Sequence, residues 1–507
     1  MNKKLGKIMT LFVLVFPLLA GMMTTTAQAA DGETVSINLH KRVFEKGASG
    51  ENPYPKQNTG EIMEDFGGEP LNNVTFEAYD VTNKYIELLS TLTDVQATAE
   101  IVKNANASNY APDYATKVGT QKTAGEGIAT FADLPLKDEK GKFKTYLFVE
   151  TNSPANIKEK AAPIVLTMPL YKGDTEVINE NVHIYPKNEK EQVLTKDLSE
   201  ESKKKLTVTI DGKEYFNVEQ GVPFGYELSA LIPWNVKDRE YYKVTDTPNK
   251  GMQVLIDTVK VEGLDKDNGD FTVAVDASGR GFVVTLNTSK QAVMNLAGKR
   301  AKITYDAYLT EDAAIDTGIN NTAVVEVGPG PDGEGPEKPE EPVVGPDIYT
   351  GGKKFEKVDD KSGKTLAGAK FNLVKVDKDG KVISYATLAN GKYTWTATAD
   401  NATSFESDTN GKLEVKGLEY SEKLTNDESY ALVEYEAPTG YAKLDKPVKF
   451  NVVKDEFTTQ TLEVKNIKKG LLPSTGGNGI YLFLAVGSLL MVGAAVWYRR
   501  TQVEVEV

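Results

Sequence analysis

The sequence predicts an all-β protein built of immunoglobulin-like β-sandwich domains in series. Short runs that alternate apolar and polar residues recur along the chain, as at Val35, Ile37 and Leu39. Gly and Asp residues typical of turns separate these runs, and few stretches favour a helix. The length of 507 residues is enough for two to four such domains.

Composition excludes several classes of function. Acidic residues outnumber basic ones, 73 to 59, for a net charge of -14, and no basic stripe is present, so we expect no nucleic acid partner. The chain has no Cys, which excludes disulfides and thiol catalysis. His40 and His183 are the only histidines, too few for a histidine-based metal site. We therefore assign no metal-ligating residues and expect no cofactor and no enzymatic activity, while a metal bound to the acidic loops, such as residues 265–268, stays open.

The N-terminus has the features of an export signal. Lys3, Lys4 and Lys7 precede an apolar stretch at residues 8–20, and Ala-Gln-Ala at 27–29 provides a small-x-small cleavage site. This order predicts a secretory signal peptide over residues 1–29, cleaved after Ala29.

Residues 30–190 are expected to form the first domain. Its strand-like runs include Tyr-Leu-Phe-Val-Glu at 146–150 and Val-His-Ile-Tyr at 182–185. A segment at about 83–107 is suited to a helix, which we interpret as an insertion between strands.

The pattern continues through a middle domain and a third domain. Residues 191–327 contain further β-rich runs and end in a predicted closing strand at 322–327. Residues 328–352 are rich in Gly, Pro and acidic residues, which predicts a semi-rigid linker. A third strand-rich domain follows at residues 353–468.

Residues 469–507 combine a short peptide motif, an apolar run and a basic end. The run at 480–498 is long enough to span a membrane, and Arg499 and Arg500 mark its cytoplasmic side. This order resembles the LPXTG sorting signal of Gram-positive surface proteins, in which a sortase cuts between the Thr and the Gly. An ordinary membrane anchor is the alternative. The motif residues are Leu472, Pro473, Ser474, Thr475 and Gly476.

Three polar residues of the third domain are predicted to point into its core. Strand side chains alternate faces, so Lys357 shares a face with Phe355, Glu434 with Leu432, and Asn466 with Leu462 and Val464. Burying a Lys, a Glu and an Asn together is costly unless the groups pair or react.

A reaction among these residues is chemically reasonable. Burial leaves Lys357 as a neutral amine nucleophile, and a Glu434 kept protonated by burial can polarise the Asn466 carbonyl. Attack then expels ammonia and leaves an isopeptide bond. The unit resembles the collagen-adhesin B-type domain, whose first-strand Lys, E-box Glu and last-strand Asn form such a bond. A solvated Lys and Glu with an Asn in a turn are the alternative.

The first domain contains a looser version of this pattern. Lys41 shares a face with Leu39 and Val43, and Asn188 shares one with Ile184 and Pro186. Glu150 lies in Phe-Val-Glu-Thr at 148–151, which resembles the same E-box. Lys41, Glu150 and Asn188 are therefore a second candidate triad, although some members of the resembled family lack a bond here.

The middle domain resembles the A-type companion of these domains. The matching segments are Leu-Thr-Lys at 194–196, Val-Thr-Asp-Thr at 244–247 and Gly-Ile-Asn-Asn-Thr-Ala at 318–323. The resemblance implies a triad of Lys196, Asp246 and Asn321, with alternation favouring Asn321 over Asn320. Because Lys203, Lys204 and Lys205 lie just before a better strand, the choice of lysine stays open.

Residues 182–188, Val-His-Ile-Tyr-Pro-Lys-Asn, resemble the pilin motif of Gram-positive backbone pilins. By alternation, Lys187 points outward and is available, while Asn188 faces the core. Pro186 is expected to end ladder pairing at this point. The alternative is an exposed lysine in a linker.

The resemblance implies a backbone subunit of a covalent surface pilus. A pilus-type sortase would hold the Thr475 carbonyl as an acyl-enzyme, which Lys187 of another subunit would attack. Accessory pilins, peptidoglycan reached through a housekeeping sortase, and host surface ligands are the further partners implied, with a location at the cell wall. A monomeric wall-anchored adhesin, or a minor pilin at the tip or base, is the alternative.

Overall fold

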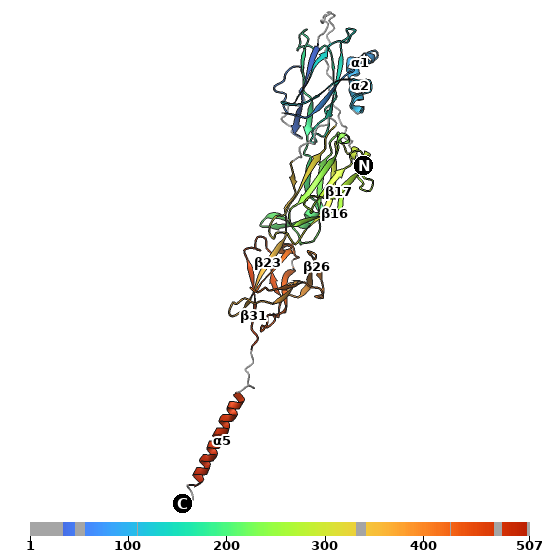
Figure 1. The fold of residues 1–507 in the computed structure, drawn as a ribbon. Helices are drawn as coiled ribbons and strands as arrows, with labels where there is room; N and C mark the ends of the chain where they lie inside the picture. Colours follow the sequence, from blue (N-terminus) through green and yellow to red (C-terminus); the bar gives the residue numbers. More distant parts are fainter. Residues whose placement is uncertain are drawn as a thin grey trace, which may run out of the picture. The chain divides into compact units, whose positions relative to one another are not determined.

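A computed structural model describes residues 34–45, 56–108, 110–330, 341–425, 427–470 and 479–503. Strands dominate these residues, and groups of sheets follow one another along the sequence, which confirms the all-β expectation (Figure 1). We call the groups the first region (residues 34–190), the middle region (191–349) and the third region (351–468). The signal peptide predicted at 1–29 and the sorting motif at 472–476 lie outside the described residues.

The described residues of the first region form three sheets, with strand orders β6-β1-β9, β10-β2-β3 and β5-β4-β7-β8. Val35, Ile37 and Leu39 of β1 are buried, as their alternation predicts. The strands are β1 (Thr34–His40), β2 (Arg42–Glu45), β3 (Glu69–Pro70), β4 (Thr75–Asp80), β5 (Thr116–Lys122), β6 (Ile128–Pro135), β7 (Thr145–Asn152), β8 (Ile164–Thr167), β9 (Asn181–Ile184) and β10 (Lys187–Lys190).

Pro186 interrupts pairing in the first region without ending it, contrary to expectation. β9 pairs in parallel with β1, and β10 resumes parallel pairing with β2 from Lys187 onward. Two residues separate β9 from β10, and only Lys41 separates β1 from β2. Between the last pair of β1 with β9 and the first pair of β2 with β10, each strand has two residues, so Lys41 lies opposite this gap. Pro lacks a backbone donor, but its carbonyl accepts a hydrogen bond of 2.9 Å from the Arg42 amide, so the two strands stay in register.

The helical insertion predicted at 83–107 is present as two helices, α1 (Thr82–Leu88) and α2 (Asp94–Ala107). Thr93 and Gln96 form a capping box that starts α2, since each side chain bonds the backbone N–H of the other residue. The helices lie beside the strands of the first region (Figure 1). Their apolar sides share a buried cluster with the β5-β4-β7-β8 sheet, including Tyr85, Ala97, Ile101, Val102, Leu147, Val149 and Val165.

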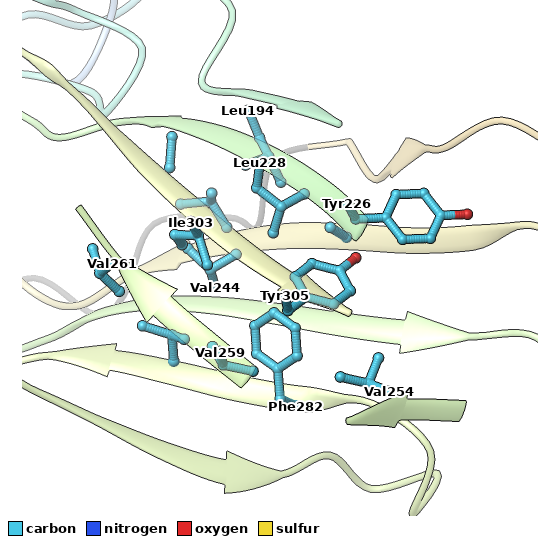
Figure 2. Close-up of a cluster of buried hydrophobic side chains, with 14 of the residues drawn as sticks. Leu194, Tyr226, Leu228, Val244, Val254, Val259, Val261, Phe282, Ile303 and Tyr305 are labelled. Atoms are coloured by element: carbon cyan, nitrogen blue, oxygen red, sulfur yellow. The ribbon is translucent and has the colours of Figure 1, made fainter. Parts of the chain in front are cut away.

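In the middle region, the part of the chain that the structure describes also forms three sheets, with strand orders β11-β14-β19-β16, β12-β13-β22 and β17-β18-β15-β20-β21. Its inward residues form one large apolar core, part of which is drawn in Figure 2. The strands are β11 (Leu194–Leu198), β12 (Thr207–Ile210), β13 (Lys213–Asn217), β14 (Phe224–Leu231), β15 (Tyr242–Pro248), β16 (Met252–Val261), β17 (Phe271–Val275), β18 (Phe282–Leu286), β19 (Arg300–Leu309), β20 (Asn321–Val327), β21 (Val343–Val344) and β22 (Ile348–Tyr349).

A short helix, α3 (Glu200–Leu206), contains Lys203, Lys204 and Lys205. These are the lysines that left the choice of the reacting lysine in the middle domain open. Ser199 caps its start, Glu200 and Glu201 occupy its first turn, and the lysines occupy its last turn, which suits the helix dipole. Lys203 forms ion pairs with Glu200 and Asp197 at the surface. Among the described residues of this region, the other helices are α4 (Gln291–Met294) and the 3-10 turn Val236–Asp238, both short.

The segment predicted as a linker, residues 328–352, is partly ordered where the structure describes it. β21 pairs with β20, and Ile348 of β22 pairs with Phe216 of β13 and is fully buried. The sequence of this segment offers only two short apolar pairs to bury, at 343–344 and 348–349, among Pro, Gly and acidic residues. Tertiary pairing therefore extends the sheets of the middle region to Tyr349.

The third region contains a β28-β23-β31 sheet and a larger sheet of order β26-β25-β24-β29-β30, in which β27 also pairs with β24. The strands are β23 (Gly351–Asp359), β24 (Lys370–Val376), β25 (Val382–Ala389), β26 (Lys392–Thr396), β27 (Ser404–Glu406), β28 (Lys412–Leu418), β29 (Ser429–Glu436), β30 (Val448–Phe450) and β31 (Thr461–Asn466); Ser421–Lys423 is a 3-10 turn.

The C-terminal helix, α5 (Gly479–Val503), contains the apolar run predicted at 480–498. Residues Tyr481–Thr501 are long and apolar enough to cross a membrane, and none of this stretch is buried against the protein. An exposed apolar helix of this length requires an apolar surrounding to be stable.

Candidate functional site

In the third region, Lys357 of β23, Glu434 of β29 and Asn466 of β31 meet in the core, and all three are buried. The Lys357 Nζ donates to the Asn466 Oδ1, and it lies 3.6 Å from the Glu434 Oε1. The Asn466 Nδ2 donates to both carboxylate oxygens of Glu434 at 3.0 Å. The carboxylate is further held by the Leu444 backbone N–H at 2.8 Å. The burial predicted from strand alternation is present.

This geometry suits attack of the amine on the amide carbon. Desolvation by burial lowers the pKa of Lys357 to about 8, which outweighs the opposing effect of Glu434 and enlarges the neutral fraction of the amine. The carboxyl group contacts the nitrogen that would leave and lies near the nitrogen that would attack. It is therefore placed to transfer the proton that converts the leaving group to ammonia.

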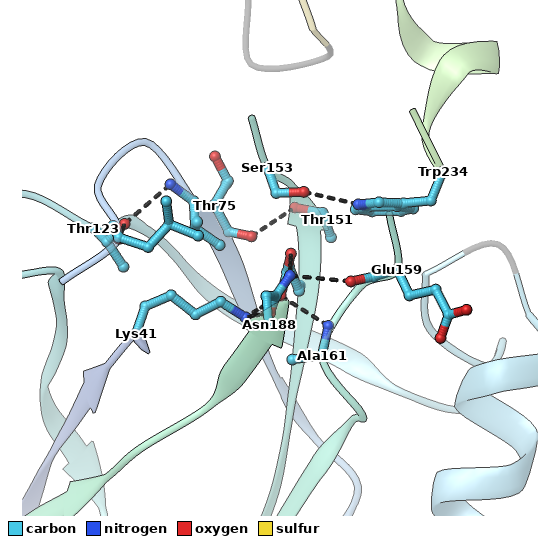
Figure 3. Close-up of polar contacts among 12 residues, drawn as sticks. Lys41, Thr75, Thr123, Thr151, Ser153, Glu159, Ala161, Asn188 and Trp234 are labelled. Atoms are coloured by element: carbon cyan, nitrogen blue, oxygen red, sulfur yellow. Dashed lines mark hydrogen bonds and ion pairs between the residues drawn. The ribbon is translucent and has the colours of Figure 1, made fainter. Parts of the chain in front are cut away.

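The first region contains a corresponding cluster (Figure 3). Lys41, between β1 and β2, directs its Nζ to the Asn188 Oδ1 of β10, and it also donates to the Glu150 Oε2 of β7 at 2.6 Å. The Asn188 Nδ2 donates to the Glu150 Oε1 at 3.3 Å and to the Glu159 backbone oxygen at 3.0 Å. Burial lowers the pKa of Lys41. The three residues singled out in the sequence are brought together and buried.

The middle region brings together Lys196 of β11, Asp246 of β15 and Asn321 of β20. The Lys196 Nζ forms an ion pair with the Asp246 Oδ2, and the Asn321 Nδ2 donates to the Asp246 Oδ1 at 2.8 Å. Desolvation by burial lowers the pKa of Lys196 to about 8. Among the candidate lysines, Lys196 is the one in the core, whereas Lys203–205 lie on α3.

Tyr305 of β19 is a fourth member of this cluster that the sequence reasoning missed. Its hydroxyl contacts Lys196, Asp246 and Asn321 at 2.6, 2.7 and 3.0 Å, respectively. Every second residue of β19 is buried, so alternation alone could have placed Tyr305 inward. A buried Tyr is ordinary in a core, however, and nothing in the local sequence marks its hydroxyl as part of a polar site.

Lys187 begins β10 and is partly buried, not fully outward as alternation suggested. Its Nζ donates to the Lys56 backbone oxygen at 3.3 Å and lies 5.0 Å from the centre of the Phe66 ring. Burial lowers its pKa. A pocket lies beside the side chain and is lined mainly by apolar groups, including Ala161, Pro163, Ile164, Ile184, Tyr185 and Pro186.

Three family models match the chain. Residues 32–189 match the N-terminal domain D1 of Gram-positive pilin subunits, residues 351–468 match the SpaA prealbumin-like fold domain, and residues 464–503 match the LPXTG cell wall anchor motif. The chain has the domains of a Gram-positive pilin. In this pilin, D1 contains Lys187 and the Lys41 cluster, and the prealbumin-like domain contains the Lys357 cluster. The anchor motif with the apolar α5 fits a surface pilin anchored in the cell wall.

The chain has relatives among the fimbrial subunits of Actinomyces. It is 27% identical over 503 residues to fimbrial subunit type 2 of Actinomyces naeslundii, covering 90% of this chain and 87% of that protein. It is 27% identical over 436 residues to fimbrial subunit type 1 of Actinomyces viscosus, covering 75% and 76% of the two chains. Its fold resembles the full-length RrgB pilus protein of Streptococcus pneumoniae, with a TM-score of 0.53 at 17% identity, covering 87% of this chain and 99% of that one.

Proposed function

We propose that this chain is the backbone subunit of a covalent cell-surface pilus, in which a pilus-type sortase joins Thr475 of one subunit to Lys187 of another. The observation that carries the proposal is the combination of a pilin D1 domain, with Lys187 in its terminal motif, and an LPXTG anchor motif in the same chain. One subunit thus supplies both the acyl donor and the acceptor amine, which a head-to-tail polymer requires.

The proposed transfer has two steps. The sortase cuts the bond between Thr475 and Gly476 and holds the Thr475 carbonyl as an acyl-enzyme, and the Lys187 amine then attacks that carbonyl. The lowered pKa of Lys187 supports this role, because only the neutral amine is a nucleophile. The protein is a substrate of this chemistry, with the catalyst supplied by the sortase. Peptidoglycan would receive the last subunit through a housekeeping sortase.

The same proposal includes internal isopeptide bonds from Lys357 to Asn466, from Lys196 to Asn321 and from Lys41 to Asn188. Each pairs a buried lysine of lowered pKa with an Asn that contacts a buried carboxylate. A chain without Cys cannot use disulfides, so such bonds would be its covalent staples. They would resist both reduction and boiling in detergent.

An immunoblot of the cell-wall fraction tests the polymer. We expect a ladder of high-molecular-weight bands that survives boiling in detergent. Deleting residues 472–476 should remove the ladder and leave uncut monomer outside the wall-bound fraction, because the sortase loses its cleavage site while α5 remains in the membrane. A single wall-bound band from the intact chain would contradict the proposal and favour a monomeric adhesin or a minor pilin.

The internal bonds should form faster as the pH rises toward 8. Protonated lysine cannot attack, and the pKa of Lys357 is about 8, so below that value the rate should rise about tenfold per pH unit and then level off. The measurement is the rate at which cross-linked third domain appears during cell-free synthesis buffered between about pH 6 and 9. A rate independent of pH over this range would contradict attack by the neutral amine.

A further inference from the structure

We propose that Tyr305 is a catalytic residue of bond formation in the middle region, relaying a proton from the attacking lysine to the departing amide nitrogen. The inference rests on the proposed bond between Lys196 and Asn321 and adds a fourth residue to its chemistry. It is carried by the position of one hydroxyl oxygen that contacts both nitrogens between which the proton must move.

The Tyr305 hydroxyl contacts three buried polar groups, and two aromatic rings pack against the Tyr305 ring. The Lys196 Nζ donates to the Tyr305 oxygen at 2.6 Å, and the Asn321 Nδ2 donates to it at 3.0 Å. The hydroxyl itself donates to the Asp246 Oδ2 at 2.7 Å. The ring is held in place by Phe282 and Tyr226, whose centres lie 4.8 and 5.6 Å away (Figure 2). The hydroxyl is therefore fixed among the reacting groups.

The proposed step balances without any further reactant. The neutral Lys196 amine attacks the Asn321 Cγ, so a bond from Nζ to Cγ forms while the attacking nitrogen still holds an excess proton. The Tyr305 hydroxyl turns from Asp246 toward Nδ2, and its oxygen takes the excess proton while its own proton passes to Nδ2. The bond from Nδ2 to Cγ then breaks. The products are an isopeptide bond and ammonia, and Tyr305 ends as it began. Burial raises the pKa of Tyr305 well above its usual value, so the hydroxyl still holds its proton when the reaction begins.

The clusters of the first and third regions differ from that of the middle region in their aromatic neighbour and in their acidic residue. Among the described residues, the ring facing the Lys41 Nζ is that of Phe76, at 5.5 Å, and the ring facing the Lys357 Nζ is that of Phe371, at 5.8 Å. Neither ring carries a hydroxyl. Both of those clusters use a Glu, whereas the middle region uses the shorter Asp246. A role for Tyr305 should therefore be confined to the middle-region bond. The proposed bonds of the first and third regions then serve as internal references in the same chain.

The test compares Tyr305→Phe with Tyr226→Phe in the full-length chain, produced in cells that lack a sortase. Tyr226 is equally buried and stacks on Tyr305, but its hydroxyl has no hydrogen-bond partner among the described residues. Tandem mass spectrometry of digests taken at successive times after synthesis measures the branched peptide that joins Lys196 to Asn321. Tyr305→Phe should slow its appearance by about 10²–10⁴-fold, the usual contribution of a positioned proton-transfer group. Tyr226→Phe should react like the native chain.

The outcomes separate the two proposals. A native chain without the branched peptide would overturn the Lys196–Asn321 bond itself. Equal rates for Tyr305→Phe and Tyr226→Phe would overturn only the role of the hydroxyl. Folding is checked in an Asn321→Ala background, where no bond can form: adding Tyr305→Phe should leave the chain folded at the assay temperature, with both other bonds complete. Unfolding of the middle region there would instead assign the hydroxyl a structural role and overturn the proposal.

Discussion

Replacing Lys187 by Arg is expected to abolish the detergent-resistant ladder while export, folding and wall anchoring continue. The guanidinium group keeps the positive charge, but it stays protonated and cannot attack an acyl-enzyme at neutral pH. Lys187→Ala should give the same result, so the pair separates a chemical role from a role of charge. The readout is an immunoblot of the wall fraction, in which monomer should persist at native abundance.

Lys190→Arg provides the matched control, because Lys190 lies on the same short strand, β10, and pairs with Glu45 at the surface. Its ladder should match that of the native chain. Glu45 and Glu69 raise the pKa of Lys190, whereas burial lowers that of Lys187. A larger fraction of the Lys187 amine is therefore neutral, which favours Lys187 over Lys190 as the nucleophile. A ladder that persists in Lys187→Arg and disappears in Lys190→Arg would reverse the assignment.

Replacing Glu434 by Ala or Gln is expected to prevent the bond between Lys357 and Asn466 and to lower thermal stability strongly. The cross-link would close a loop of 109 residues, and by analogy with a disulfide over such a loop it is worth about 4 kcal/mol. For a domain of this size, that corresponds to a fall of roughly 15–30 °C in the midpoint of unfolding. Glu434→Gln keeps the packing of the side chain. A similar fall of the unfolding midpoint in both variants would therefore attribute the lost stability to the missing bond.

Intact mass and thermal unfolding of residues 31–468 measure this effect together. Each bond removes one molecule of ammonia, so the Glu434 variants should be heavier than the native fragment by one ammonia, apart from the substitution itself. Glu436→Gln is the control, because Glu436 lies on the same strand but is exposed and pairs with Lys370. A native fragment with the unmodified mass would remove the isopeptide proposal for every region.

Strand alternation was enough to predict the fold class and the burial of most candidate residues. Lys357, Glu434 and Asn466 each lie in a strand two residues after an apolar residue on the same face, so their inward direction follows from local sequence. The same argument succeeded less well for Lys187. Its covering groups, Lys56 and Phe66, come from a segment far away in the sequence, and alternation says nothing about such contacts.

The features that sequence reasoning missed depend on tertiary contacts. Pairing resumes after Pro186 because β2 continues alongside β10. Ile348 becomes part of a sheet because β13 offers it an edge. Tyr305 joins a polar site because three side chains from other strands converge on its hydroxyl. The position of Lys196 in the core, by contrast, was predicted from a resemblance of short segments and agrees with the alternating burial of β11.

The most direct test of the central claim is tandem mass spectrometry of fibres purified from the cell wall and digested. The account predicts a branched peptide in which the Thr475 carbonyl is joined to the Lys187 Nζ, with residues after Thr475 absent from the fibre. A junction mapped to another lysine, such as Lys190, or fibres without any covalent junction between subunits, would contradict it.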